Sequence, residues 1–168
     1  MQTARVLLRE WRDEDLAPFA AMNADPEVMR YFPSTLSRDE SDALALRLRD
    51  ALTQQGWGLW AAESDGVFIG FVGVSRVRFT AHFTPCLELG WRLARHAQGR
   101  GLATEAALAV RDFVKRELPR EPVVSFTVPA NQPSRRVMEK LGLRFDGEFD
   151  HPSLPLGHAF RRHVLYRL

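Results

Sequence analysis

At 168 residues, the chain has the length of a single domain, residues 1–168, and its 45% hydrophobic residues are enough for a sizeable core. The formal net charge is only +2, and no basic run with interleaved aromatics occurs, which argues against a nucleic-acid surface. No stretch of about 18 apolar residues exists, so we expect no membrane span. The N-terminus has no long apolar signal segment and the lone Cys86 has no disulfide partner, so we expect a cytoplasmic protein.

Hydrophobic periodicity and turn residues predict the order β-α-α-β-β-β-α-β-α-β-β along the chain. The clearest helix start is the capping box of Ser37 and Glu40, and the clearest hairpin turn is Asp65-Gly66. Gly70 and Gly73 indicate a bulge in the strand that follows. The predicted elements are, in order, a strand at 6–9, a helix at 16–22, a short helical turn at 27–31, a helix at 38–52, strands at 58–63 and 67–74, a loop at 76–86, a strand at 87–93, a helix at 102–114, a strand at 123–128, a helix at 131–141, and strands at 145–149 and 159–168.

This order mixes a meander of strands with helical crossovers. It predicts an α+β fold, in which helices cover both faces of a mixed sheet.

The stretch Gln98-Gly99-Arg100-Gly101-Leu102-Ala103 joins a predicted strand to a predicted helix. Its two glycines allow a tight turn and a close approach of the backbone to a ligand. The first amides of the helix lack intrahelical acceptors, and the helix dipole adds partial positive charge there, which favours a phosphate or pyrophosphate. No Lys-Ser or Lys-Thr follows the second glycine, and Thr104 stands where a dinucleotide fingerprint has its third glycine. The stretch is therefore neither a P-loop nor a Rossmann motif.

The pattern Gln-x-x-Gly-x-Ala in this stretch resembles the acetyl-CoA pyrophosphate loop of the GNAT superfamily of N-acetyltransferases. Other segments are similar to the RimJ/RimL-type branch of that superfamily: Glu88-Leu89-Gly90-Trp91, Asn131-Gln132-Pro133-Ser134, Leu141-Gly142-Leu143 and Arg162-His163-Val164-Leu165-Tyr166. The resemblance implies a GNAT-like fold, with a mostly antiparallel sheet and a splayed strand pair, 87–93 and 123–128, between which the cofactor enters.

The function that this resemblance implies is the transfer of an acetyl group from acetyl-CoA to a primary amine, on a protein N-terminus or a small molecule. The amine would attack the thioester directly in a ternary complex. One alternative is a non-catalytic sensor module that binds CoA with the same fold. Another is a site for a different phosphate ligand, such as a dinucleotide.

The catalytic roles carried over by the resemblance fall on Glu88 and Ser134. Glu88 is the candidate general base, because burial in an apolar strand raises the pKa of a carboxyl group. Its alternative role is a structural ion pair with an arginine. Ser134 is the candidate acid for the thiolate, unless water takes that role, and its alternative role is that of an ordinary first-turn residue.

The cofactor contacts follow from the same resemblance. A backbone N–H near Trp91 to Leu93 is expected to polarise the thioester carbonyl, and Asn131 to bind the pantetheine unless it is only a helix cap. The predicted cofactor residues are Trp91, Leu93, Gln98, Gly99, Arg100, Gly101, Leu102, Ala103 and Asn131.

The amine acceptor is expected at the N-terminal helices and the hairpin, and the alternative role of the aromatic side chains there is in the core. The predicted acceptor residues are Asn23, Met29, Phe32 and Trp60, with Tyr31, Trp57, Phe83 and His151 as further candidates. The polar Asn23 and Glu27 are the candidates for binding the ammonium of the acceptor. The histidines show no metal-ligand spacing, so we expect no metal, and Cys86 reads as a structural thiol. The sequence leaves a monomer and a homodimer equally open.

Overall fold

A seven-stranded sheet in the order β1-β2-β3-β4-β5-β7-β6 runs through the computed structural model, which describes residues 1–168. The strands are β1 Leu7–Arg9, β2 Leu59–Ser64, β3 Val67–Arg76, β4 Leu87–Leu93, β5 Val123–Thr127, β6 Arg144–Asp150 and β7 Arg162–Arg167. The helices are α1 Leu16–Ala24, α2 Pro26–Met29, α3 Arg38–Gln55, α4 Leu102–Glu117 and α5 Gln132–Lys140, with short 3-10 turns at Asp13–Asp15 and Arg95–Ala97. Only β4 and β5 pair in parallel, so the predicted mixed and mostly antiparallel sheet is confirmed.

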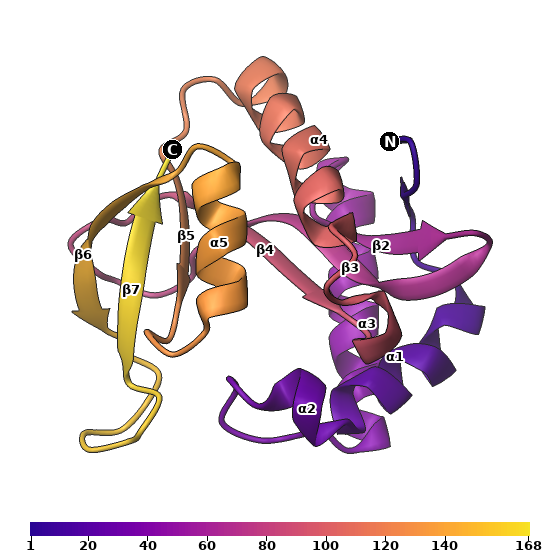
Figure 1. Ribbon diagram of the computed structural model, residues 1–168, viewed down its shortest axis with the longest axis horizontal. Helices are drawn as coiled ribbons and strands as arrows, with labels where there is room; N and C mark the ends of the chain where they lie inside the picture. Colours follow the sequence, from indigo (N-terminus) through magenta and orange to yellow (C-terminus); the bar gives the residue numbers. More distant parts are fainter.

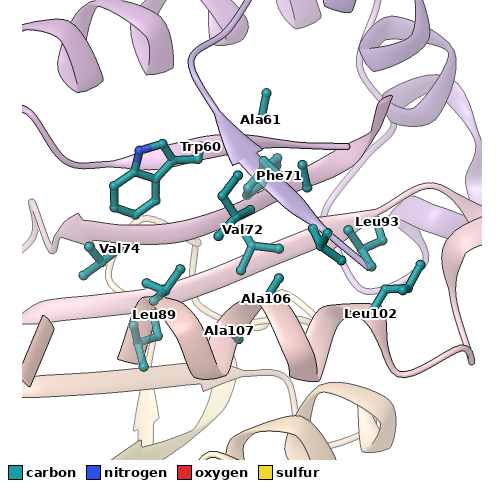
Figure 2. Close-up of a cluster of buried hydrophobic side chains, with 14 of the residues drawn as sticks. Trp60, Ala61, Phe71, Val72, Val74, Leu89, Leu93, Leu102, Ala106 and Ala107 are labelled. Carbon is teal, nitrogen blue, oxygen red and sulfur yellow. The ribbon is translucent and has the colours of Figure 1, made fainter. Parts of the chain in front are cut away.

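Helices cover both faces of the sheet, as predicted. On one face, the ring of Phe71 in β3 packs against that of Phe19 in α1, with the ring centroids 6.1 Å apart. On the other face, the ring of Trp60 in β2 packs edge-on against Phe113 of α4, with the centroids 5.4 Å apart. Figure 2 shows how Leu89 and Leu93 of β4 lie against α4, where Leu102, Ala106 and Ala107 face the sheet. Alternate residues of β3 and β4 therefore point to opposite faces of the sheet, one covered by α1 and the other by α4.

The local signals read from the sequence form as predicted. Ser37 Oγ accepts from the Glu40 N–H at 3.2 Å, and the Glu40 carboxylate accepts from the Ser37 N–H at 2.7 Å, so the capping box opens α3. Asp65 and Gly66 both have positive φ, 53° and 74°, which a two-residue hairpin turn of this kind requires.

The two glycines of β3 have different roles. The pairing of β2 with β3 shifts where Ala62 faces Gly70 and Glu63 faces Phe68, so the predicted bulge lies just before Gly70. Gly73 pairs without a shift, but a Cβ atom there would overlap the Gly58 carbonyl. Gly73 is thus a point of close backbone approach and not a bulge, which corrects half of that prediction.

The last strand is shorter than predicted. β7 begins at Arg162 and not at residue 159, because a turn occupies the preceding residues. In that turn, the Arg161 N–H donates to the His158 carbonyl at 2.9 Å, and the Phe160 N–H donates to His158 Nδ1 at 3.1 Å. The turn places Phe160 on the wall of the cavity described below.

Candidate active site

The strands β4 and β5 pair at only two positions, Leu87 with Val123 and Glu88 with Val124. The Ser125 hydroxyl adds one link to the Leu89 carbonyl at 2.8 Å, and beyond it the strands diverge, as Figure 1 shows. A cavity of about 870 Å³ opens at this splay, within the size range of ligand sites. Residues from both faces of the sheet line it, so the cavity passes through the sheet. The splay expected between these strands is present.

The loop between β4 and α4 presents a row of free amides on one side of the splay. The first backbone bond of α4 runs from the Glu105 N–H to the Gly101 carbonyl at 3.0 Å, and the amides of residues 99–104 donate to no acceptor in the protein. Gly99 and Gly101 have φ of 73° and 80°, a conformation that side chains disfavour. Six free donors at a helix N-terminus form an anion site suited to a pyrophosphate.

Contacts from the N-terminal strand region brace this loop. The Arg5 guanidinium donates to the Arg100 carbonyl at 3.0 Å and forms an ion pair with Glu105 at 2.7 Å. The Thr3 hydroxyl donates to the same Glu105 carboxylate at 2.6 Å, which lowers the pKa of Glu105. Gln98 donates from its side chain to the Leu93 carbonyl at 2.9 Å and so fixes the other end of the loop. No local pattern indicated these roles for Thr3 and Arg5, which lie about a hundred residues away from their partners in the sequence.

Hydrogen bonds near the ends of β4 show toward which neighbouring strand each of its amides points. The Leu87 N–H donates to the Pro122 carbonyl at 2.8 Å, on the β5 side of the strand. The Ala94 N–H donates to the Ile69 carbonyl at 2.9 Å, on the β3 side. Because successive amides of a strand point to opposite edges, the Trp91 N–H points toward β5. No residue of β5 pairs with it, so this N–H faces the open splay.

Glu88 lies half-buried on the wall of the cavity, on the opposite face of the sheet from α4. Its carboxylate makes no hydrogen bond and no ion pair, and Ser75 is its neighbour across to β3. Burial alone raises the pKa of Glu88 to about 8. The alternative role of a structural ion pair with an arginine is therefore not what this carboxyl does.

Asn131 and Ser134 line the cavity from the start of α5. Asn131 caps the helix: its Oδ1 accepts from the Ser134 N–H at 3.3 Å, and its Nδ2 donates to Thr127 Oγ1 at 2.9 Å. The Ser134 hydroxyl makes no hydrogen bond to the protein. The helix-cap role that the sequence left open for Asn131 is thus present, and it holds the residue at the cavity wall.

The predicted cofactor residues gather at the splay with one exception. Those that line the cavity are Trp91, Leu93, Gln98, Gly99, Gly101, Leu102, Ala103 and Asn131. Arg100 belongs to the loop, but its side chain is exposed, does not line the cavity and forms no ion pair. Its carbonyl rather than its guanidinium takes part in the loop structure, through the bond from Arg5.

Three of the four predicted acceptor residues do not lie on the cavity wall, and only Phe32 does. Met29 is 3% exposed and part of the core. Trp60 lies on the α4 side of the sheet because it pairs with Val72, whose side chain belongs to that layer. Asn23 is fully buried, and its side chain bonds Ser41 and an arginine instead of facing the cavity.

Other side chains complete the wall of the cavity, and apart from Tyr31 and His151 they were not among the candidates from the sequence. Arg92 lies on the same face as Glu88, and its position in a strand gave no signal of its role. Aromatic and histidine side chains from β5, β7 and two loops form the opposite wall: Phe79, Phe126, His151, Phe160 and His163. Tyr31 also lines the cavity, whereas Phe83 is buried behind this wall.

The two histidines of this wall lie close together, with ring centroids 5.1 Å apart. Burial is the main cause that lowers the pKa of both His151 and His163, which favours the neutral form of each ring. Cys86 is buried next to this cluster, which raises the pKa of its thiol and fits a structural residue.

Two further observations bear on the class of protein. No group of three or more His, Cys, Asp or Glu side chains is arranged to hold a metal ion. None of the helices has both the length and the apolar composition needed to cross a membrane.

The chain matches the sequence profile of the acetyltransferase (GNAT) domain over residues 5–144. It is 28% identical over 166 residues to the uncharacterized N-acetyltransferase YnaD of Bacillus subtilis (strain 168), covering 99% of this chain and 94% of YnaD. Its fold is similar to that of a GNAT-family acetyltransferase from Bacillus anthracis, with a TM-score of 0.81 and 22% identity, over 100% of this chain and 96% of the other. It is also similar to Mycobacterium smegmatis RimJ in complex with CoA-disulfide, with a TM-score of 0.76 and 24% identity, over 97% and 81% of the two chains. Together with the splay and the amide-lined loop, these matches show that the chain belongs to the GNAT family of acetyltransferases.

Proposed function

We propose that this acetyltransferase moves the acetyl group of acetyl-CoA to a primary amine, by direct attack within a ternary complex at the splay. The observation that carries the proposal is a single cavity through the sheet with complementary chemistry on its two sides. The free amides of residues 99–104 lie on one side, and the unpaired carboxyl of Glu88 lies on the other.

On the cofactor side, the amides of the loop bind the pyrophosphate of acetyl-CoA, and the free edge of β4 pairs with its pantetheine arm. When bound, acetyl-CoA supplies an activated acetyl thioester. The Trp91 N–H is the donor that we assign to the thioester oxygen, where charge develops as the amine attacks. Asn131, held by its bonds to α5 and Thr127, is available to the pantetheine through the remaining capacity of its amide.

On the acceptor side, Glu88 acts as the general base. A carboxylate with a pKa of about 8 is well matched to an ammonium proton near neutral pH. In the reaction, the N–C bond forms and the C–S bond breaks, Glu88 takes the proton that the amine loses, and CoA leaves as a thiolate. Ser134, or a water at its hydroxyl, is the donor that we assign to the thiolate, and its free hydroxyl on the cavity wall supports this role.

The test is an acetyl-transfer assay with acetyl-CoA and a panel of small amines and N-terminal peptides, with released thiol and acetylated product measured in parallel. Glu88→Gln is the decisive variant, because it keeps the shape of the side chain and removes the base. We expect it to bind CoA as the wild type does and to lose turnover. A CoA-binding sensor would show no product with any amine and no difference between the two proteins.

A further inference from the structure

Arg92 is held rigidly on the acceptor side of the cavity. Its guanidinium lies over the Phe32 ring, 4.1 Å from the centroid, and 5.5 Å from the centroid of Phe71. One of its Nη atoms donates to Asn23 Oδ1 at 2.7 Å, and Asn23 Nδ2 donates in turn to the buried Ser41 hydroxyl at 2.9 Å. Two aromatic rings and a buried amide thus fix the orientation of the guanidinium before any ligand binds.

No carboxylate of the protein neutralises this cation. Arg92 forms no ion pair, and its Nε is buried without a hydrogen-bond partner. Burial lowers the pKa of Arg92 to about 10, which still leaves the guanidinium charged at neutral pH. A partly buried charge without a counterion is costly, and such a site gains free energy when an anion binds.

The other charged groups on this side of the cavity do not offset Arg92. Glu27 forms an ion pair with Arg30 at 3.5 Å. Arg76 also lines the cavity, and it forms an ion pair at 2.8 Å with Glu121, which lies outside the cavity. Arg78 also lines the cavity, and its exposed side chain forms no ion pair. Glu88 is the only acid on this side of the cavity without an ion-pair partner, and in the proposed function it takes the proton of the amine.

We propose that Arg92 binds a carboxylate or phosphate group of the acceptor, so that the acceptor is an amine that also carries an anionic group. This inference rests on the proposed function and specifies the substrate class of the same site. Glu88 and Arg92 lie four residues apart on β4, which separates their Cα atoms by about 13 Å. The spacing suits an acceptor whose amine and anion are several bonds apart, such as a short peptide with an acidic end or an ω-amino acid.

The role proposed for Asn23 changes accordingly. The sequence suggested that Asn23 would bind the ammonium of the acceptor, but it instead holds the group that we assign to the opposite charge. Phe32, the only one of the four main predicted acceptor residues on the cavity wall, stacks under the same guanidinium. An arginine in this setting presents donors to a planar or tetrahedral oxyanion better than a lysine can.

The experiment compares acceptors that differ only in the anionic group. The set is ε-aminocaproate, its carboxamide, an aminoalkyl phosphate of similar length, and the matching diamine, and each is tested for kcat/KM with the wild type. We expect the acid or the phosphate to exceed the carboxamide by about 10–100-fold, as expected for hydrogen bonds to a charged group. The comparison of acid with phosphate identifies which of the two anions the site takes.

Arg92→Met, Arg92→Lys and the control Arg78→Met are then tested with the same acceptors. In Arg92→Met we expect the ratio of kcat/KM for the anionic acceptor to that for the carboxamide to fall to about one. Arg92→Lys should keep part of the preference, and Arg78→Met should keep all of it. Thermal unfolding of each variant with acetyl-CoA present checks that it is folded, and the comparison in the wild type needs no variant at all.

Four results would overturn the inference. Equal rates for the anionic acceptors and the carboxamide in the wild type would do so, and so would a preference that survives in folded Arg92→Met. If the diamine alone is acetylated, the acetyl-transfer function stands and the inference about Arg92 is wrong. If acetyl-CoA binds but no amine of any charge is acetylated, the proposed function itself fails, and the inference fails with it.

Discussion

Replacement of Glu88 by glutamine removes the one unpaired carboxyl group at the splay and leaves the shape of the cavity nearly unchanged. A positioned general base contributes about 10²- to 10⁴-fold in rate, or about 2.7–5.5 kcal/mol of transition-state free energy. We therefore expect Glu88→Gln to lower kcat/KM by at least about a hundredfold at pH 9, where most of the wild-type carboxyl is ionised.

The effect of Glu88→Gln depends on pH in a direction that the raised pKa determines. A pKa of about 8 means that only about one molecule in a hundred carries ionised Glu88 at pH 6. The rate ratio of wild type to variant should thus fall by about tenfold for each pH unit below 8, whatever the ionisation of the amine itself, which is common to both proteins. Initial rates of thiol release between pH 6 and 9 measure this ratio, with the exposed Glu14→Gln as control. A ratio that stays constant with pH, or a fully active variant, would refute the assignment of Glu88 as the base.

The stability of Glu88→Gln provides a check that is independent of activity. The folded state holds the Glu88 proton more tightly than the unfolded chain, whose carboxyl has a pKa near 4.5. The proton on Glu88 therefore adds to the wild-type free energy of unfolding. This contribution is fully present below pH 4.5 and is lost as the pH rises through about 8. Because the carboxylate has no partner to lose, the variant should unfold at the same or a higher temperature than the wild type, and the difference should grow between pH 6 and 9.

Three other substitutions test the loop, the cap and the sheet. Gly101→Ala should weaken acetyl-CoA binding in calorimetry, because φ there is 80°, whereas Gly157→Ala, with φ of 81° outside the site, should cost similar stability and leave binding unchanged. Asn131→Ala should lower the free energy of unfolding by about 1 kcal/mol through loss of the α5 cap, and also weaken CoA binding; unchanged binding would reduce Asn131 to a structural residue. Gly73→Ala should destabilise the protein by about 1–3 kcal/mol or more in chemical denaturation, because its Cβ would meet the Gly58 carbonyl, and a neutral result would contradict the close approach of the strands.

Features that depend on neighbours in sequence were predictable. The capping box of Ser37 and Glu40 and the Asp65-Gly66 turn are encoded within four residues, and both form as expected. The glycine loop was recognised because its free amides are a property of a helix start, whatever the rest of the fold.

Features that depend on which face of a strand meets which helix were not predictable. Trp60 lies on the α4 side because of its register with Val72, which no local pattern states. The link between Arg92 and Asn23 joins residues 69 positions apart in the sequence. Arg92 looks like an ordinary strand residue, and Asn23, which was predicted to bind the acceptor, contacts Arg92 only because the fold brings the two together.

We infer that the cavity at the splay is the acetyl-CoA site of this acetyltransferase. Calorimetric titration of the wild type with acetyl-CoA, CoA and ATP tests it most directly, with Gly101→Ala as the variant and Gly157→Ala as its control. We expect micromolar binding of acetyl-CoA with one site per chain, competition by CoA, no heat from ATP, and a weaker isotherm for Gly101→Ala alone. No heat from acetyl-CoA, or binding of ATP at least as tight, would contradict it.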